Sequence, residues 1–148
     1  MQVKELGHVV LYVRDLARSV AFYGGVLGWR NVPVPMRGAA MFSGGRTHHE
    51  LLLIEVGASA QPIPKGRRVG MYHFGLKIGE TDVELREALA QVQAAGVEIA
   101  GTADHTVTHS LYILDPDGNE IELYVDVPGV DWANDPQAIA APVKALRL

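Results

Sequence analysis

An internal repeat restricts the fold of this 148-residue chain more than any other feature of its sequence. Residues 7–29 and residues 72–99 each open with a histidine on an alternating apolar run, which is the pattern of a strand. A helix-capping residue follows, Asp15 in the first segment and Thr81 or Asp82 in the second, and then come apolar residues at helical spacing. Because the two segments share this order, we expect one strand–helix unit to occur twice.

Three short strand-like runs follow each strand–helix unit. Their expected bounds are about 29–35, 39–43 and 47–56 in the first half, and about 97–101, 109–114 and 119–126 in the second. The Asp-Pro-Asp-Gly-Asn segment at 115–119 has the composition of a hairpin turn and would present Glu122 on the last strand. The sequence therefore predicts an α+β fold of two βαβββ modules with mixed sheets.

The repeat also predicts the domain organisation. We expect a single domain over residues 1–127 and a C-terminal extension over residues 128–148, which matches neither half. The expected parts of the domain are a module at about 1–57, a Pro- and Gly-rich linker at 58–69 and a module at about 70–127. The extension is expected to lie on the surface, where Trp132 would anchor packing of the tail or of a neighbouring subunit and would not contact substrate.

Composition excludes several classes of protein. Hydrophobic residues make up 48% of the chain and the mean hydropathy is +0.09, which is too apolar for a disordered chain. No apolar run approaches the roughly 20 residues that span a bilayer, and the N-terminus lacks the layout of a signal peptide. The absence of cysteine excludes disulfides and fits a cytoplasmic protein. A net charge of −4 argues against nucleic acid as the partner.

Three metal-ligating side chains fall on strand faces opposite to the apolar ones. His8 and His73 open the equivalent strands of the two modules, and Glu122 alternates with apolar residues on the last strand. A histidine at a strand start is more often a surface residue, but the repeated position and the cost of burying Glu122 alone favour a ligand role. If the two sheets curve toward each other, the three residues converge in a cup, and two imidazoles with one carboxylate suit non-haem Fe(II).

Three segments carry a resemblance to a known family: GHVVLYVRDLARSVAFYGGVLGW, YHFGLKI and DPDGNEIELY. They resemble the vicinal oxygen chelate superfamily, which comprises glyoxalases, fosfomycin- and bleomycin-resistance proteins and extradiol dioxygenases. The resemblance extends over about residues 3–127. It implies paired βαβββ modules that form one curved mixed sheet around a metal-binding cup, and a homodimer as the expected assembly.

Within the superfamily, the chain most resembles single-module extradiol dioxygenases of the catechol 2,3-dioxygenase kind. That resemblance implies Fe(II), or else Mn(II), and three ligands, His8, His73 and Glu122. It implies a small aromatic diol and O₂ as substrates. It also implies an acid/base role for His49, from the His-His pair that opens the fourth strand, and hydrogen bonds from Tyr112 and His105 to a substrate oxygen.

The His-His pair fits this chemistry because a catechol must lose protons and bound O₂ must gain them. A histidine that lies near the metal without binding it can transfer both near neutral pH. Strand alternation places His49 on one face with Leu51, Leu53 and Glu55. We therefore expect His49 to point into the cup and His48 to point outward.

Glu55 leaves a second reaction class open. By spacing it is the first-half counterpart of Glu122, and in glyoxalase I-like relatives that position supplies a fourth ligand to Ni(II) or Zn(II). Its alternative role is a surface ion pair with Lys77 or an arginine. The alternatives on the same cup are a glyoxalase I-like isomerase or lyase, a thiol transferase, and a drug-binding resistance protein without catalysis. The His-His pair, His105 and Tyr112 favour the dioxygenase.

Overall fold

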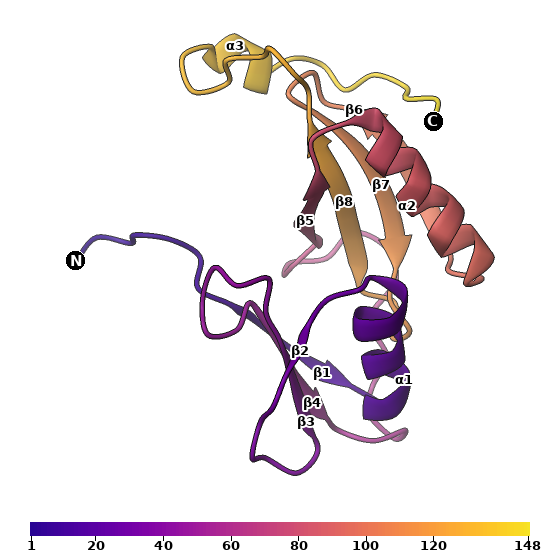
Figure 1. Cartoon of the computed structure of the whole chain (residues 1–148). Helices are drawn as coiled ribbons and strands as arrows, with labels where there is room; N and C mark the ends of the chain where they lie inside the picture. The colour runs from indigo at the N-terminus through magenta and orange to yellow at the C-terminus, as the bar shows by residue number, and fades with distance from the viewer. The chain divides into compact units, whose positions relative to one another are not determined.

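The two modules form two sheets of four strands each (Figure 1). The computed structural model describes all 148 residues, which divide into two compact units, Met1–Ile63 and Pro64–Leu148. Each unit has the element order βαβββ, so the predicted α+β class and the two predicted modules are confirmed. None of the helices combines the length and the apolar character needed to cross a membrane.

In the first unit the strand order is β1-β4-β3-β2. Strand β1 runs parallel to β4, whereas β3 is antiparallel to both β4 and β2. The helical segment begins as an α-helix and continues as a π-helical turn, which contains the adjacent Gly24 and Gly25. The bounds are β1 Val9–Val13, α1 Leu16–Val20, η1 Ala21–Val26, β2 Asn31–Val32, β3 Ala39–Phe42 and β4 Leu51–Glu55.

The core of the first unit lies between this helical segment and one face of the sheet. Asp15 caps the helix, as predicted, because its Oδ1 accepts the N–H of Arg18 at 2.9 Å. The buried ring of Tyr23 lies 5.9 Å from the ring of Phe42 on β3. Phe42 is opposite Leu51 of β4, and Leu51 and its face neighbour Leu53 are fully buried. The helix-covered face of this sheet is therefore the face of Leu51 and Leu53.

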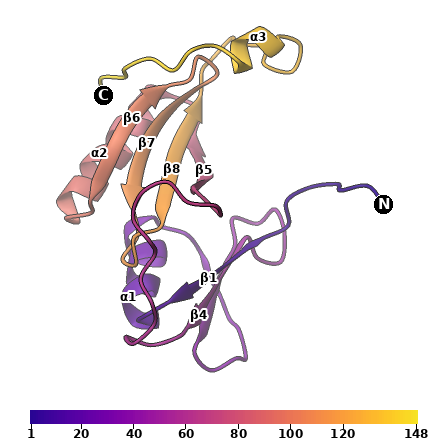
Figure 2. The same cartoon turned by 180° about the vertical axis from the view of Figure 1, so that it is seen from behind.

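In the second unit the strand order is β5-β8-β7-β6, with β5 parallel to β8 and the other pairs antiparallel. Helix α2 runs along one face of this sheet (Figures 1 and 2). Its buried Leu85 and Val92 pack toward the buried apolar residues of β7 and β8. The bounds are β5 His73–Gly79, α2 Asp82–Ala94, β6 Ile99–Asp104, β7 Thr108–Leu114, β8 Glu120–Asp126 and α3 Pro136–Ile139.

A capping box joins β5 to α2. Thr81 is the N-cap, and its hydroxyl accepts the N–H of Glu84 at 3.4 Å. The Glu84 carboxylate in turn accepts the N–H of Glu80 and the hydroxyl of Thr81, both at 2.8 Å. A Cβ at Gly79 would overlap the Glu84 carboxylate, so a side chain there would displace this carboxylate from the box.

The predicted turn before the last strand is confirmed. Asp115 is buried, and its carboxylate accepts the N–H groups of Asp117 and Asn119 at 2.9 and 2.7 Å. Gly118 has φ +89°, which an L-residue rarely adopts. This turn fixes where β8 begins and so sets which of its side chains face α2.

Residues 128–148 pack within the second unit. Backbone hydrogen bonds join Asp104 and Lys144 in both directions, at 3.0 and 2.9 Å. The Thr102 hydroxyl donates to the carbonyl of Leu146 at 2.8 Å. Ala138 of α3 is buried. The C-terminal segment is thus attached along β6.

Candidate functional site

The predicted site residues of the second unit lie on the sheet face opposite α2. On β7 and β8 the buried pairs Leu111–Leu123 and Ile113–Ile121 share the α2 side. The alternating positions lie on the other side, where Tyr112 is directly opposite Glu122. Strand β5 contributes to the same face, because Gly75 pairs with Glu122 and His73 with Glu120.

Glu122 is the centre of the hydrogen bonds on this open face. Its Oε1 accepts the Ser110 hydroxyl at 2.6 Å and the Tyr112 hydroxyl at 3.2 Å. Its other oxygen, Oε2, lies 3.3 Å from Nε2 of His73. A Cβ at Gly75 would lie 3.3 Å from the Tyr124 ring and in ordinary contact with Oε2, so Gly75 leaves little room beside the carboxylate. Glu122 is half-buried, with 16% of its side chain exposed.

His73 has one nitrogen without a hydrogen-bond partner. Its Nδ1 is buried and lies 3.6 Å from Oε1 of Glu120, while its Nε2 points toward Glu122. The rings of Tyr72 and Tyr112 flank the imidazole at centroid distances of 4.6 and 5.4 Å. A nitrogen and a carboxylate oxygen 3.3 Å apart on paired strands are a donor set that fits a divalent metal. Glu120 is placed to orient the ring from its other side.

Tyr112 and His105 lie in direct contact. Nε2 of His105 is 2.7 Å from the Tyr112 hydroxyl. Burial raises the pKa of Tyr112 to about 12, and the charge of Glu122 and its hydrogen bond add to the shift. Tyr112 is therefore a hydroxyl donor at neutral pH, with Glu122 and His105 as alternative acceptors.

His105 is held on a tight turn between β6 and β7. Its N–H donates to the carbonyl of Thr108 at 2.9 Å. Thr106 follows at φ +70°, a conformation that is strained for a β-branched residue. The Asp104 carboxylate supports this backbone by accepting the Thr106 N–H at 2.7 Å. Asp104, which precedes His105 in the sequence, thus shapes the turn.

The predicted histidines of the first unit form their own cluster. The ring of His49 lies 4.6 Å from that of His8 and 4.4 Å from that of His48, and Nδ1 atoms of His48 and His49 are 2.5 Å apart. Desolvation, followed by the charges of His48 and His8, lowers the pKa of His49 below 6.5. Neutral His49 is thus the favoured form near neutral pH.

The prediction that strand alternation decides where His49 points is wrong. Strand β4 begins only at Leu51, so His49 belongs to the preceding loop and strand alternation does not extend to it. Leu51 and Leu53 lie on the helix-covered face, opposite Val9 and Leu11 of β1. His48 is exposed and His49 half-buried, and the loop rather than the strand sets this difference.

Glu55 has a partner of its own on the helix-covered side. It is opposite Val13, and its Oε1 accepts the N–H of Leu16 at the start of α1 at 2.9 Å. Lys77, considered above as an ion-pair partner of Glu55, instead pairs with Asp126 and Glu80, both at 2.6 Å.

Glu50 is a residue that the sequence analysis missed. Its carboxylate accepts the N–H groups of Gly44 and Thr47, at 2.7 and 2.8 Å, and so closes the loop that carries the His-His pair. Nothing in the sequence distinguishes it from other strand-flanking acids. Ser110 was also missed, although strand alternation could have found it, because it lies two positions from Tyr112 on the same face.

Within either unit, no group of three or more His, Cys, Asp or Glu side chains is arranged so that it could hold a metal ion. The predicted ligands are divided between the units, with His8 in the first and His73 and Glu122 in the second. The second unit brings together His73, Glu122, Tyr112 and His105, and the first brings together His8 and His49.

Comparisons with known proteins relate the chain to a family and to named relatives. A family model described as Glyoxalase/Bleomycin resistance protein/Dioxygenase superfamily matches residues 5–123. The chain is 37% identical to catechol-2,3-dioxygenase of Bacillus subtilis (strain 168), over 88% of this chain and 44% of the relative. It is 30% identical to biphenyl-2,3-diol 1,2-dioxygenase 3 of Rhodococcus globerulus, over 82% of this chain and 63% of the relative. The chain thus spans less than two thirds of the length of both relatives.

A solved structure shows the same fold. A glyoxalase/dioxygenase from Nostoc punctiforme superposes with a TM-score of 0.72 over 84% of this chain and 92% of that one, at 24% identity. This likeness extends over both βαβββ modules.

Proposed function

Because the chain belongs to the Glyoxalase/Bleomycin resistance protein/Dioxygenase superfamily, we propose that it is a metal-dependent dioxygenase that cleaves the ring of a catechol-type diol with O₂. The observation that carries the proposal is the open face of the second unit. There a carboxylate and an imidazole lie 3.3 Å apart, beside a hydroxyl and a second imidazole 2.7 Å apart. Two relatives named as diol dioxygenases support the substrate class.

His73 and Glu122 of the second unit would hold the metal, and His8 is the third ligand that the family resemblance implies. We favour Fe(II), since two imidazoles and one carboxylate leave positions open for both substrates. A bound Fe(II) ion would supply the redox chemistry that joins a diol and O₂. Glu55 is left out of the ligand set because its carboxylate already accepts the Leu16 N–H.

The protein's own groups would orient the substrate and transfer protons. Tyr112 keeps its proton at neutral pH, because its pKa is about 12, and can donate to a substrate oxygen. His105 can accept from Tyr112 or hold it in place, since the two atoms are within 2.7 Å. His49, with a pKa below 6.5, is available as a base for a diol proton near neutral pH.

Oxygen uptake by protein loaded anaerobically with Fe(II) tests the proposal. Substituted catechols should give uptake matched by a yellow ring-cleavage product. His73→Ala should abolish both. His109→Gln is the matched control, because His109 lies on the α2 side of the same sheet, 2.6 Å from Asp82. Tight metal binding without uptake for any diol would contradict the proposal and direct assays to isomerase and thiol-transfer substrates.

A further inference from the structure

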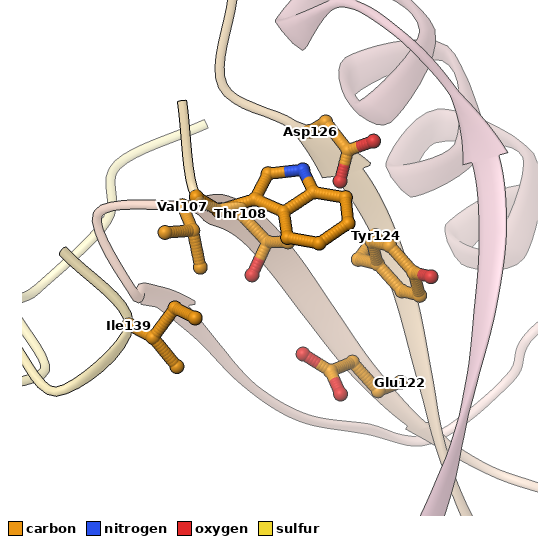
Figure 3. A pocket seen from close by; sticks show the side chains of 7 residues that line it. Val107, Thr108, Glu122, Tyr124, Asp126 and Ile139 are labelled. Atoms are coloured by element: carbon orange, nitrogen blue, oxygen red, sulfur yellow. The ribbon is translucent and has the colours of Figure 1, made fainter. Parts of the chain in front are cut away.

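An open pocket of about 420 Å³ lies beside Glu122 in the second unit. Strands β7 and β8 line it with Thr108, Glu122, Tyr124 and Asp126. Figure 3 shows Glu122 and Tyr124 on one side of this pocket and Ile139 on the other. The volume is in the range of sites that bind small molecules, roughly 300–1,000 Å³.

The C-terminal segment provides the far wall of the pocket. Trp132 and Ile139 both line it, although both side chains are more than half exposed, at 54% and 58%. Large apolar side chains exposed beside a carboxylate are a feature of ligand sites. The segment that carries them is fixed to β6 by the backbone bridge between Asp104 and Lys144.

The charges around the pocket restrict what it can bind. Its two charged lining residues, Glu122 and Asp126, are both acids. Lys77 lies 2.6 Å from Asp126 but is not among the lining residues. A carboxylate on the substrate would therefore meet like charge, whereas an uncharged ring would meet the indole of Trp132 and the ring of Tyr124.

We propose that the C-terminal segment is a specificity wall of the site, in which Trp132 and Ile139 bind the uncharged, apolar substituent of a ring diol whose hydroxyls lie at Glu122. This deepens the proposed function and rests on it. The substrate class is a catechol with an aryl or alkyl substituent, not one with a carboxylate side chain. Trp132, expected from the sequence to serve packing only, is here a substrate-binding residue.

A binding measurement tests the wall without turnover. The chain has two tryptophans, so Trp29→Phe leaves Trp132 as the only indole. Protein without added metal is titrated with 2-phenylphenol and with 2-phenylbenzoate, a neutral probe and an anionic probe of similar size. We expect saturable quenching by the phenol and at least ~10-fold weaker binding of the benzoate. By calorimetry, Trp132→Ala should weaken phenol binding by ~10-fold and Ile139→Ala by a few-fold.

Two controls separate this inference from the proposed function. Val143→Ala alters an exposed apolar residue of the same segment that does not line the pocket, and should change nothing. With Fe(II)-loaded enzyme, Trp132→Ala should lower kcat/KM for phenylcatechol relative to catechol by ~10-fold, and Trp132→Phe should restore most of it. Trp132→Ala could instead cleave catechols with an unchanged kcat/KM ratio for phenylcatechol relative to catechol and bind 2-phenylphenol with unchanged affinity. That result would overturn the proposed role of the C-terminal segment and leave the proposed function standing. Selective phenol binding without any cleavage would support the wall and overturn the dioxygenase.

Discussion

The two modules carry the same Ile-Glu pair on the strand that runs parallel to their first strand, yet the two glutamates face opposite sides of their sheets. Glu55 shares its strand face with the buried Leu51 and Leu53 and reaches the helix start. Glu122 alternates with the buried residues of β8 that face α2, and so it points to the open side. The face that the helix covers, and not the Ile-Glu dipeptide, therefore decides which glutamate is available as a ligand.

The modules also differ in how they hold their histidines. In the first unit His48 and His49 lie on a loop that is closed by the Glu50 carboxylate. In the second unit His73 belongs to a strand, and its partners lie on paired strands. One repeated plan thus places the proposed proton-transfer group on a loop and the proposed ligand pair on strands. Strands fix geometry more tightly than loops do, which suits a ligand better than an acid/base group.

The largest expected effect comes from exchanging each glutamate for glutamine. Glu122→Gln should lower Fe(II) affinity and ring cleavage by at least about 100-fold. The reason is that Glu122, the proposed ligand and the acceptor of two hydroxyl hydrogen bonds, would lose its charge. Glu55→Gln should leave cleavage unchanged and reduce the free energy of unfolding by about 0.5–1 kcal/mol, because the Leu16 N–H keeps a weaker acceptor. Metal analysis, oxygen uptake and urea denaturation measure these effects. Equal losses of metal from both variants would break the comparison and return Glu55 to the ligand set.

The second-largest effect should come from removing the Tyr112 hydroxyl on the open face. Tyr112→Phe should lower kcat by about 10- to 100-fold while Fe(II) stoichiometry is kept, because a proton donor is lost but no ligand. The matched control is Tyr12→Phe, since Tyr12 is an exposed tyrosine of β1 and is not a predicted proton donor. Loss of bound metal in Tyr112→Phe would show that the hydroxyl serves to hold Glu122 and not to act on the substrate.

The sequence predicted the fold from its periodicity because both modules obey the same local rules of strand alternation and capping. Strand alternation placed Glu122 on its face for the same reason, whereas Tyr112 was predicted from the family resemblance and lies opposite Glu122 on the paired strand. The face of Glu55 could not be predicted, because residues 51–54 are all apolar and do not mark which face the helix covers. His49 was assigned to a strand that begins two residues later, at Leu51. Glu50 and the pocket role of Trp132 depend on contacts between segments distant from regular strands, which no local pattern encodes.

A smaller effect should come from the residue behind His73. Glu120→Gln should reduce Fe(II) affinity by about 10-fold, because a carboxylate near Nδ1 raises the basicity of the ring and fixes its orientation. Competition with a chelator measures this affinity. Glu120→Asp withdraws the carboxylate without removing its charge, and an intermediate affinity is expected. Unchanged affinity in Glu120→Gln would limit Glu120 to its contact with Tyr72, whose pKa it raises.

The smallest effect concerns the loop of the first unit. Hydrogen bonds from Gly44, Thr47 and Ser43 and the charge of Arg46 outweigh burial and lower the pKa of Glu50 below 4.5. A carboxyl whose pKa is lower in the folded state stabilises that state above its unfolded pKa, and this stabilisation is lost as the pH falls through the folded value. Glu50→Gln should therefore reduce the free energy of unfolding by about 1 kcal/mol at pH 7, with the difference from the parent protein shrinking at pH values below 4.5.

Urea denaturation of both proteins across this pH range measures the difference. Glu87→Gln on the exposed side of α2 is the control and should show no such pH dependence. If the loop is what presents His49, Glu50→Gln should also lower kcat, whereas Glu87→Gln should not. A stability loss without any change in kcat would mean that the first unit presents His49 by its contact with His8 and not by the loop, and the contrast between loop-borne and strand-borne groups would then disappear.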